Sequence, residues 1–212
     1  SSYAGILGIS TIVGEEPAAV VVLRKRHNKI RKTVYKEMIR AIGRLGMDKS
    51  DFDIGITPMQ IRYKKTGNII YFAGSDSIDD TKGIIDEDRP IKLVILDELT
   101  EFFDVGEGEE ELTNIEATFV RGNDEDFRMV YLYNPPKNPY DWINEWISKQ
   151  EQNPDYYIDT STYLDDKWGF TTKQQLDLIN QYKDNDYDYY RWLYLGEVIG
   201  LGTNIFNMAN LH

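Results

Sequence analysis

Two short apolar runs constrain the fold of this chain more than any other feature. Residues 18–23 read Ala-Ala-Val-Val-Val-Leu and residues 93–96 read Leu-Val-Ile-Leu, with no polar position in either run. Strands that are apolar at every position are buried on both faces, as strands are inside a parallel sheet covered by helices. The two runs therefore predict an α/β fold with helices on both sides of a sheet.

The rest of the chain alternates between helical and extended patterns. Apolar spacing of three to four residues predicts helices at 1–13, 28–45, 140–149, 172–182 and around 189–195. Extended patterns predict further strands at 59–63, 68–72, 127–133 and 156–160, and the Lys-Lys-Thr-Gly turn at 64–67 makes the first two a hairpin. We expect a single domain over 1–212, with three α/β/α layers, a mainly parallel central sheet and an inserted β-hairpin.

The charge balance limits where nucleic acid can bind. The chain carries 24 basic against 36 acidic residues, a net charge of -12, which argues against a surface that is cationic throughout. Nine cations nevertheless fall within 21 residues, at positions 24, 25, 26, 29, 31, 32, 36, 40 and 44. Such a run is usually a solvated helix face, but on an anionic body it is also suited to local contact with phosphates.

The residue types and segments that the chain lacks limit its cellular compartment and its metal chemistry. It has no cysteine, which excludes disulfides and thiolate metal sites and favours a reducing cytosol. No apolar run approaches the length of a membrane span, and no signal peptide is recognisable, so no membrane partner is expected. The two histidines, His27 and His212, are too far apart in the sequence to suggest a metal site.

The sharpest chemical signal is the pair Asp97-Glu98, which follows directly after the second apolar run. Open α/β sheets bind ligands at the carboxyl ends of their strands. Phosphoryl transfer needs a carboxylate that holds Mg²⁺ and a group that orients the attacking water, and Asp97 and Glu98 suit these roles in that order. The alternative is that the pair simply begins a solvated loop.

A second strand end carries an amide. Residues 133–136 read Tyr-Asn-Pro-Pro, so the strand at 127–133 stops at Asn134, because proline cannot continue a ladder. Asn134 could hydrogen-bond a γ-phosphate or its water, although Asn-Pro is more often a structural turn.

Taken in order, six segments resemble the large terminase subunits of tailed bacteriophages. They are Val-Leu-Arg-Lys at 22–25 with Ile-Arg-Lys-Thr-Val-Tyr at 30–35, Ile-Tyr-Phe-Ala-Gly at 70–74, Leu-Asp-Glu-Leu-Thr-Glu-Phe at 96–102, Tyr-Asn-Pro-Pro-Lys at 133–137, Thr-Tyr-Leu-Asp-Asp at 162–166 and Tyr-Arg-Trp-Leu-Tyr-Leu-Gly-Glu at 190–197. Each is weak alone, and the resemblance rests on their order over nearly the whole chain.

The resemblance implies a P-loop NTPase of the additional-strand, conserved-glutamate type. Such an ATPase would use ATP and Mg²⁺ to pump double-stranded DNA into a viral procapsid in the host cell cytoplasm. Its partners would be a portal protein, a small terminase subunit and further copies of itself in a ring. Asp97 would be the Walker B metal residue, Glu98 the catalytic glutamate and Asn134 the residue coupling hydrolysis to movement.

The family also has a phosphate-binding loop of the form G-x-x-x-x-G-K-[ST] before the first helix. This chain begins at Ser1, so we expect Ser1 to be the hydroxyl residue after the missing lysine and a ligand of the metal, with Ser2 opening the helix that faces the phosphates. Arg24 is a further candidate for the nucleotide. Without the glycines and lysine the chain is expected to bind nucleotide poorly, and a C-terminal nuclease domain is also expected to be missing.

Two further sets of cations follow from this interpretation. The candidates for DNA contact are Lys25, Arg26, Lys29, Arg31 and Lys32. The candidates for an arginine finger that completes a neighbouring subunit's site are Arg89, Lys82 and Arg121.

Two other functions remain open from the sequence. A non-catalytic α/β interaction domain would leave Asp97-Glu98 without a purpose, so that Glu98→Gln would change nothing. A helicase-like motor would share the carboxylate pair but not the Tyr-Asn-Pro-Pro segment. The acidic stretch 104–111 is expected to be a loop.

Overall fold

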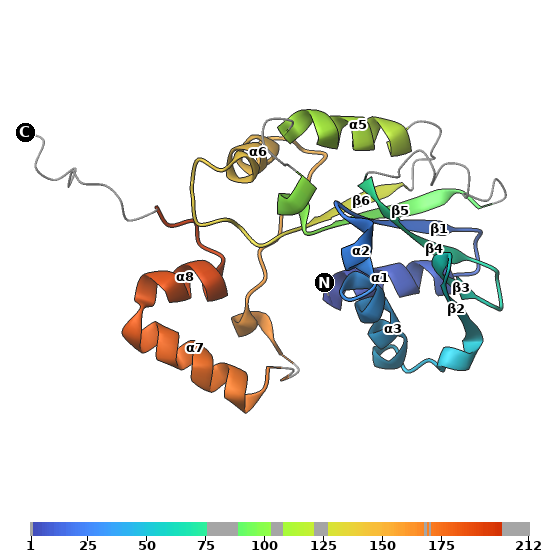
Figure 1. Ribbon diagram of the computed structural model, residues 1–212, viewed down its shortest axis with the longest axis horizontal. Helices are drawn as coiled ribbons and strands as arrows, with labels where there is room; N and C mark the ends of the chain where they lie inside the picture. The colour runs from blue at the N-terminus through green and yellow to red at the C-terminus, as the bar shows by residue number, and fades with distance from the viewer. Residues whose placement is uncertain are drawn as a thin grey trace, which may run out of the picture. The chain divides into compact units, whose positions relative to one another are not determined.

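The computed structural model describes residues 2–75, 89–102, 108–120, 127–167, 169 and 171–200 (Figure 1). The chain divides into two compact units, 1–133 and 134–212, and each is described by itself. The first unit contains the whole sheet, and the second contains helices. A single functional domain over 1–212 stays a prediction.

The first unit is built on a six-stranded sheet in the order β2-β3-β4-β1-β5-β6. Strands β4, β1, β5 and β6 are mutually parallel, and β3 is antiparallel to both β2 and β4. The bounds are β1 Ala19–Arg24, β2 Phe52–Ile56, β3 Met59–Tyr63, β4 Ile69–Gly74, β5 Ile91–Asp97 and β6 Arg128–Leu132. The mainly parallel sheet is therefore confirmed.

The predicted hairpin is confirmed, and one further strand extends it. Strand β3 pairs antiparallel with β4 across residues 64–67, β4 also pairs with β1 in the parallel core, and a second hairpin, β2–β3, turns at Thr57-Pro58. The signal that sequence reasoning passed over is the alternation of Phe52, Ile54 and Ile56. A Gly and a Pro near it weaken the strand pattern, and pairing with β3 overrides that weakness.

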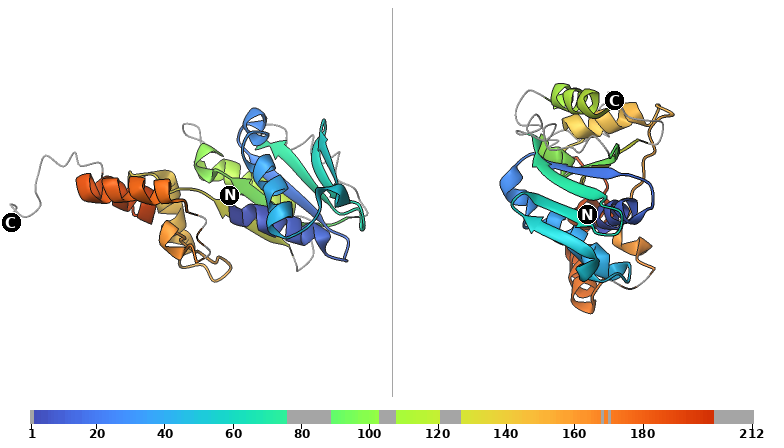
Figure 2. Two further views of the ribbon diagram at one scale, coloured as in Figure 1. Left: turned by 90° about the horizontal axis from the view of Figure 1, so that it is seen from below. Right: turned by 90° about the vertical axis from the view of Figure 1, so that its right-hand side faces the viewer.

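Helices cover the sheet on both faces (Figures 1 and 2). Helices α1 Ser2–Val13 and α3 Val34–Arg44 lie together on one face, and α5 Gly108–Val120 lies on the other. Every residue of β1 and β4 is buried between these layers, as the apolar runs require. The short 3₁₀ helices are η1 Lys49–Asp51 and η3 Leu99–Phe102.

One helix prediction and one loop prediction are wrong in detail. The helix expected at 28–45 is interrupted, because α2 His27–Ile30 ends before α3 begins, and Thr33 has φ -122° and ψ -102° between them. The Thr33 hydroxyl accepts from Arg24 and donates to the carbonyl of Lys29, and such local bonds compete with helix geometry. The acidic loop expected at 104–111 is helical from Gly108 onward, while 104–107 lie outside the described residues.

Helix α1 approaches α3 closely at its glycines. A Cβ atom on Gly5 would lie 2.9 Å from the backbone oxygen of Glu37 and 3.2 Å from the Cβ of Ala41. A backbone atom cannot move aside as a flexible side chain can, so the two helices need glycine at this position.

Gly5→Ala is therefore expected to lower the free energy of unfolding by about 1–3 kcal/mol, the usual cost of overpacking. Gly43→Ala is the matched control, because nothing lies within 4 Å of a Cβ atom there. Gly43 lies in the last turn of α3, so that change should stabilise by at most about 0.5–1 kcal/mol, the value for a helix interior. Urea unfolding of both variants measures the difference, and equal effects would contradict the close packing.

A buried asparagine fixes the end of α1. The Asn68 side chain accepts from the amide of Ala18 at 3.0 Å and donates to the carbonyls of Gly14 and Glu16 at 3.1 and 2.8 Å. These bonds hold the C-terminal end of α1 where β1 and β4 begin. The first turn of α1 accordingly lies at the other end of the sheet, where the parallel strands end (Figure 1).

The second unit contains α6 Trp142–Gln150, η4 Tyr163–Asp165, α7 Lys173–Asn185 and α8 Tyr187–Leu195. The strand expected at 156–160 is wrong: the segment joins no ladder, and most of its side chains face solvent. Its pattern of tyrosines resembles a strand, but no neighbouring strand satisfies its backbone in the described residues. None of the helices that the structure describes has the length and apolar character needed to cross a bilayer.

Candidate active site

The parallel strands bring the candidate residues to one edge of the sheet. Arg24 is the last residue of β1 and Asp97 the last of β5, and the register pairs Leu23 with Leu96 and Asp97 with Leu132. Carboxyl ends of parallel strands meet at one edge, which is where such sheets bind ligands. The first turn of α1 lies at the same edge, so its free backbone N–H groups are available to an anion there.

Asp97 is a buried carboxyl group with one cation beside it. Asp97 is 4% exposed and Arg24 is 6% exposed. The Oδ2 atom of Asp97 lies 3.8 Å from Nη1 of Arg24. Burial raises the pKa of Asp97, and the positive charge of Arg24 offsets this only in part, while Glu98 adds to the rise. A buried carboxylate that is incompletely compensated is suited to receive a cation.

This pKa gives a pH-dependent prediction. Because the pKa in the folded chain lies above its ordinary value of 3.8, Asp97 contributes stability below pH 3.8 and loses it as pH rises through the raised pKa. The free energy of unfolding of Asp97→Asn relative to wild type should therefore increase from pH 4 to pH 7. Urea unfolding across this range measures it, and a difference that stays constant with pH would contradict the buried, ionised state.

Glu98 holds an unusual backbone conformation. Its φ is 55°, and it is the one non-glycine residue with positive φ among those the structure describes. The left-handed region costs a non-glycine residue free energy, and such strain concentrates at functional sites. The turn at Glu98 lets the next residues enter η3, where Leu99 is buried and the amide of Glu101 donates to the Glu98 carbonyl.

Arg24 links this edge to a second carboxylate. Its Nε lies 3.4 Å from Oε2 of Glu101, and the Nζ of Lys29 donates to Oε1 of Glu101 at 2.8 Å. Burial by itself would raise the pKa of Glu101, but the hydrogen bond from Lys29 and the charges of Arg24 and Lys29 outweigh it and lower the pKa. The sequence did not indicate Glu101 and Thr33 as partners of Arg24, because a linear pattern does not show which side chains will lie together in space.

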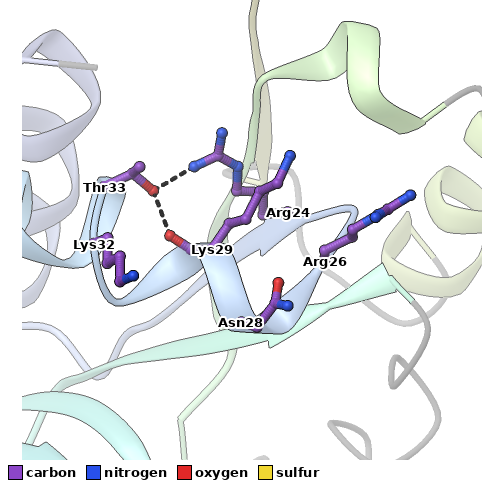
Figure 3. A pocket seen from close by; sticks show the side chains of 6 residues that line it. All are labelled: Arg24, Arg26, Asn28, Lys29, Lys32 and Thr33. Carbon is purple, nitrogen blue, oxygen red and sulfur yellow. Dashed lines mark hydrogen bonds between the residues drawn. The ribbon is translucent and has the colours of Figure 1, made fainter.

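A cationic hollow of about 420 Å³ adjoins Arg24. It is lined by Arg24, Arg26, Asn28, Lys29, Lys32 and Thr33 (Figure 3). Arg24, Arg26 and Lys29 extend to the same side of the segment in this view. Lys25 lies apart from this lining and pairs with Glu111 of α5 at 2.7 Å.

The other predicted site residues are dispersed. Ser2 begins α1, whereas Ser1, Lys82 and Arg121 lie outside the described residues. Arg89 precedes β5 and donates to the carbonyl of Thr66, so it lies at the opposite end of β5 from Asp97. Asn134 follows β6 by two residues and belongs to the second unit, so its place at the site stays a prediction.

No triad of metal-ligating side chains occurs in the described part of the chain. A divalent cation held by Asp97 alone would need water or phosphate oxygens as its other ligands. This is the coordination that Mg²⁺ prefers, since it keeps several waters and uses one or two carboxylates.

Comparison with known proteins gives a consistent result. A family model described as phage terminase large subunit matches residues 9–197. The large terminase subunit of Bacillus phage SPP1 is 28% identical over 190 residues, covering 88% of this chain and 43% of that protein. This chain thus spans less than half the length of that relative.

Two solved structures share the fold. The large terminase of a thermophilic bacteriophage, in complex with ADP, has a TM-score of 0.59 at 16% identity, over 92% of this chain and 44% of that one. The HK97 bacteriophage large terminase has a TM-score of 0.58 at 14% identity, over 92% of this chain and 43% of that one. At these identities the two structures show likeness of fold alone.

Proposed function

Because this chain belongs to the phage terminase large subunit family, we propose that it is the ATP-hydrolysing part of a motor that moves double-stranded DNA into a viral procapsid. Its fold is that of a P-loop NTPase, with three α/β/α layers. The relative with bound ADP supports a nucleotide site in this fold. DNA translocation, the portal protein, the small terminase subunit, the ring of copies and the host cytoplasm are parts of the proposal.

The observation that carries this proposal is the edge where Asp97 and Glu98 end β5 and the first turn of α1 begins. Asp97 would hold Mg²⁺, which supplies charge neutralisation on the phosphate oxygens. Glu98 would orient the attacking water and accept its proton, because its carboxylate follows directly after the residue that holds the metal. The N–H groups at the start of α1, with Ser2, would face the phosphates.

The topology supports a phosphate loop ahead of Ser1. The crossover from β1 through α3 to β4 and any crossover from an earlier strand through α1 to β1 lie on the same face of the sheet. Since such crossovers are right-handed, both must run in the same direction across the sheet. Because β1, β5 and β6 are direct neighbours in the sheet, an earlier strand would then lie beyond β6, whose residues are exposed or half-buried rather than buried as in β1. Its loop would open at the edge that carries Asp97.

The remaining roles complete the proposal. Asn134 would couple hydrolysis to movement, and Arg24 would act near the nucleotide through its pair with Asp97. Arg89, Lys82 and Arg121 are the candidates for a finger that reaches a neighbouring subunit. Arg89 is compatible with that role, because its end of β5 lies away from its own chain's site.

The test is ATP hydrolysis by the full-length protein, with the segment upstream of Ser1, in the presence and absence of double-stranded DNA. The expected result is Mg²⁺-dependent hydrolysis that increases with DNA. A full-length protein that hydrolyses no ATP under either condition would overturn the proposal.

A further inference from the structure

Exposed cations lie along α3 and in the turn that precedes it. They are Arg31 and Lys32 in the turn and Lys36, Arg40 and Arg44 on the helix, and we call them together the α3 cationic face. Lys36, Arg40 and Arg44 recur every four residues, so they follow one side of the helix. The opposite side of α3 is buried against α1 and the sheet.

The charge of the α3 cationic face is largely uncompensated. Its one carboxylate, Glu37, is shared by two arginines: it pairs with Arg40, and its Oε2 lies 3.2 Å from Nη1 of Arg44. Burial would raise the pKa of Glu37, but the hydrogen bond and charge of Arg40, with those of Arg44, lower it. Arg31, Lys32 and Lys36 form no ion pair with any residue that the structure describes.

Two cations named from the sequence are already engaged elsewhere. Lys25 pairs with Glu111 at 2.7 Å and Lys29 pairs with Glu101 at 2.8 Å. Releasing either lysine for an external anion would leave a partly buried carboxylate without its partner, which costs free energy. The surface available to an external anion therefore begins at Arg31 and continues along α3.

The cationic hollow lies at the start of this surface. Lys32 belongs both to the α3 cationic face and to the lining of the hollow. Arg24 also lines it, but its guanidinium is already paired with Asp97 and Glu101. A lysine without a carboxylate partner among the described residues, such as Lys32, beside a hollow favours an anionic group with several acceptor oxygens, such as a phosphate.

We propose that the α3 cationic face binds the sugar-phosphate backbone of duplex DNA, with one phosphate group seated in the hollow. This rests on the proposed function. From Lys36 to Arg44 the helix advances about 12 Å, a length over which duplex DNA carries about seven charges. The anionic remainder of the chain repels such a polymer, which confines contact to this face. Phosphate contacts of this kind are independent of base sequence.

The test is the salt dependence of DNA binding by the full-length protein, measured by fluorescence anisotropy of a short labelled duplex. Replacing Lys32 and Lys36 together by alanine is expected to weaken binding equally for unrelated sequences and to reduce the slope of log K against log salt by about 2. The double variant Lys49→Ala/Lys65→Ala removes the same charge from exposed positions off this face and should keep the wild-type slope.

Three outcomes separate the possibilities. Equal slopes for both double variants overturn this inference, while the proposed function stands if hydrolysis still responds to DNA. A full-length wild-type protein that neither binds DNA nor hydrolyses ATP overturns both. If the Lys32/Lys36 variant keeps the wild-type slope but loses self-association in sedimentation, the face joins two copies of the chain and does not bind DNA.

Discussion

Glu98→Gln in the full-length protein is expected to reduce steady-state ATP turnover by roughly 10²- to 10⁴-fold, the usual contribution of a positioned general base. Glutamine keeps the size of the side chain and its place after Asp97, but it cannot accept the proton of the attacking water. Nucleotide affinity should be retained, because Asp97 and the first turn of α1 are unchanged. A phosphate-release assay measures turnover, and equilibrium binding of a labelled nucleotide measures affinity.

Glu110→Gln is the matched control for this prediction. Glu110 is exposed in the first turn of α5, so the same chemical change there should leave turnover at the wild-type level. The proposed role fails if Glu98→Gln turns over ATP as fast as this control. Loss of nucleotide binding in Glu98→Gln would also contradict it, since the residue is assigned to the chemical step alone.

Arg24→Met is expected to lower the free energy of unfolding by about 3–5 kcal/mol, the cost of leaving a buried ion-pair partner uncompensated. Arg24 is the nearest cation to the buried Asp97, at 3.8 Å, and also approaches Glu101 at 3.4 Å. Methionine preserves most of the volume but none of the charge. Urea unfolding at neutral pH measures the loss of stability. Neutral pH is needed because Arg24 compensates Asp97 and Glu101 only when both carboxylates are ionised.

Arg40→Met makes the same replacement at an exposed pair. The Arg40 side chain is 63% exposed, and its pair with Glu37 is expected to contribute about 0–1 kcal/mol. Combining Arg24→Met with Asp97→Asn should restore part of the lost stability, because it removes the stranded charge as well. If Arg24→Met costs no more than Arg40→Met, Arg24 does not compensate the buried carboxylates.

The sequence predicted the central sheet well and its periphery poorly. The runs at 18–23 and 93–96 became β1 and β5 with ends shifted by one or two residues, because an uninterrupted apolar run is stable only when both faces are covered. The segment 156–160 has the tyrosines and isoleucine that are typical of strands, yet it forms no strand. Local pattern alone cannot supply the neighbour that a strand needs.

The sequence by itself determined the type of fold and the place of two carboxylates at the end of one strand. An apolar run is stable when it is buried as a strand, and the charged residues that follow it end that strand at an edge of the sheet. These are local consequences of residue type, so a linear pattern carries them.

Only the tertiary structure decided which charges are engaged. Arg24 lies 73 residues from Asp97 in sequence but 3.8 Å away in space, and Lys25 lies 86 residues from Glu111 but 2.7 Å away. Folding divided one basic run into cations paired with carboxylates of distant elements and cations exposed along α3 and the turn before it. The physical reason is that an ion pair forms between groups that the packing of distant strands and helices brings together. The residues next to each charge in the sequence do not show which distant charge will lie beside it.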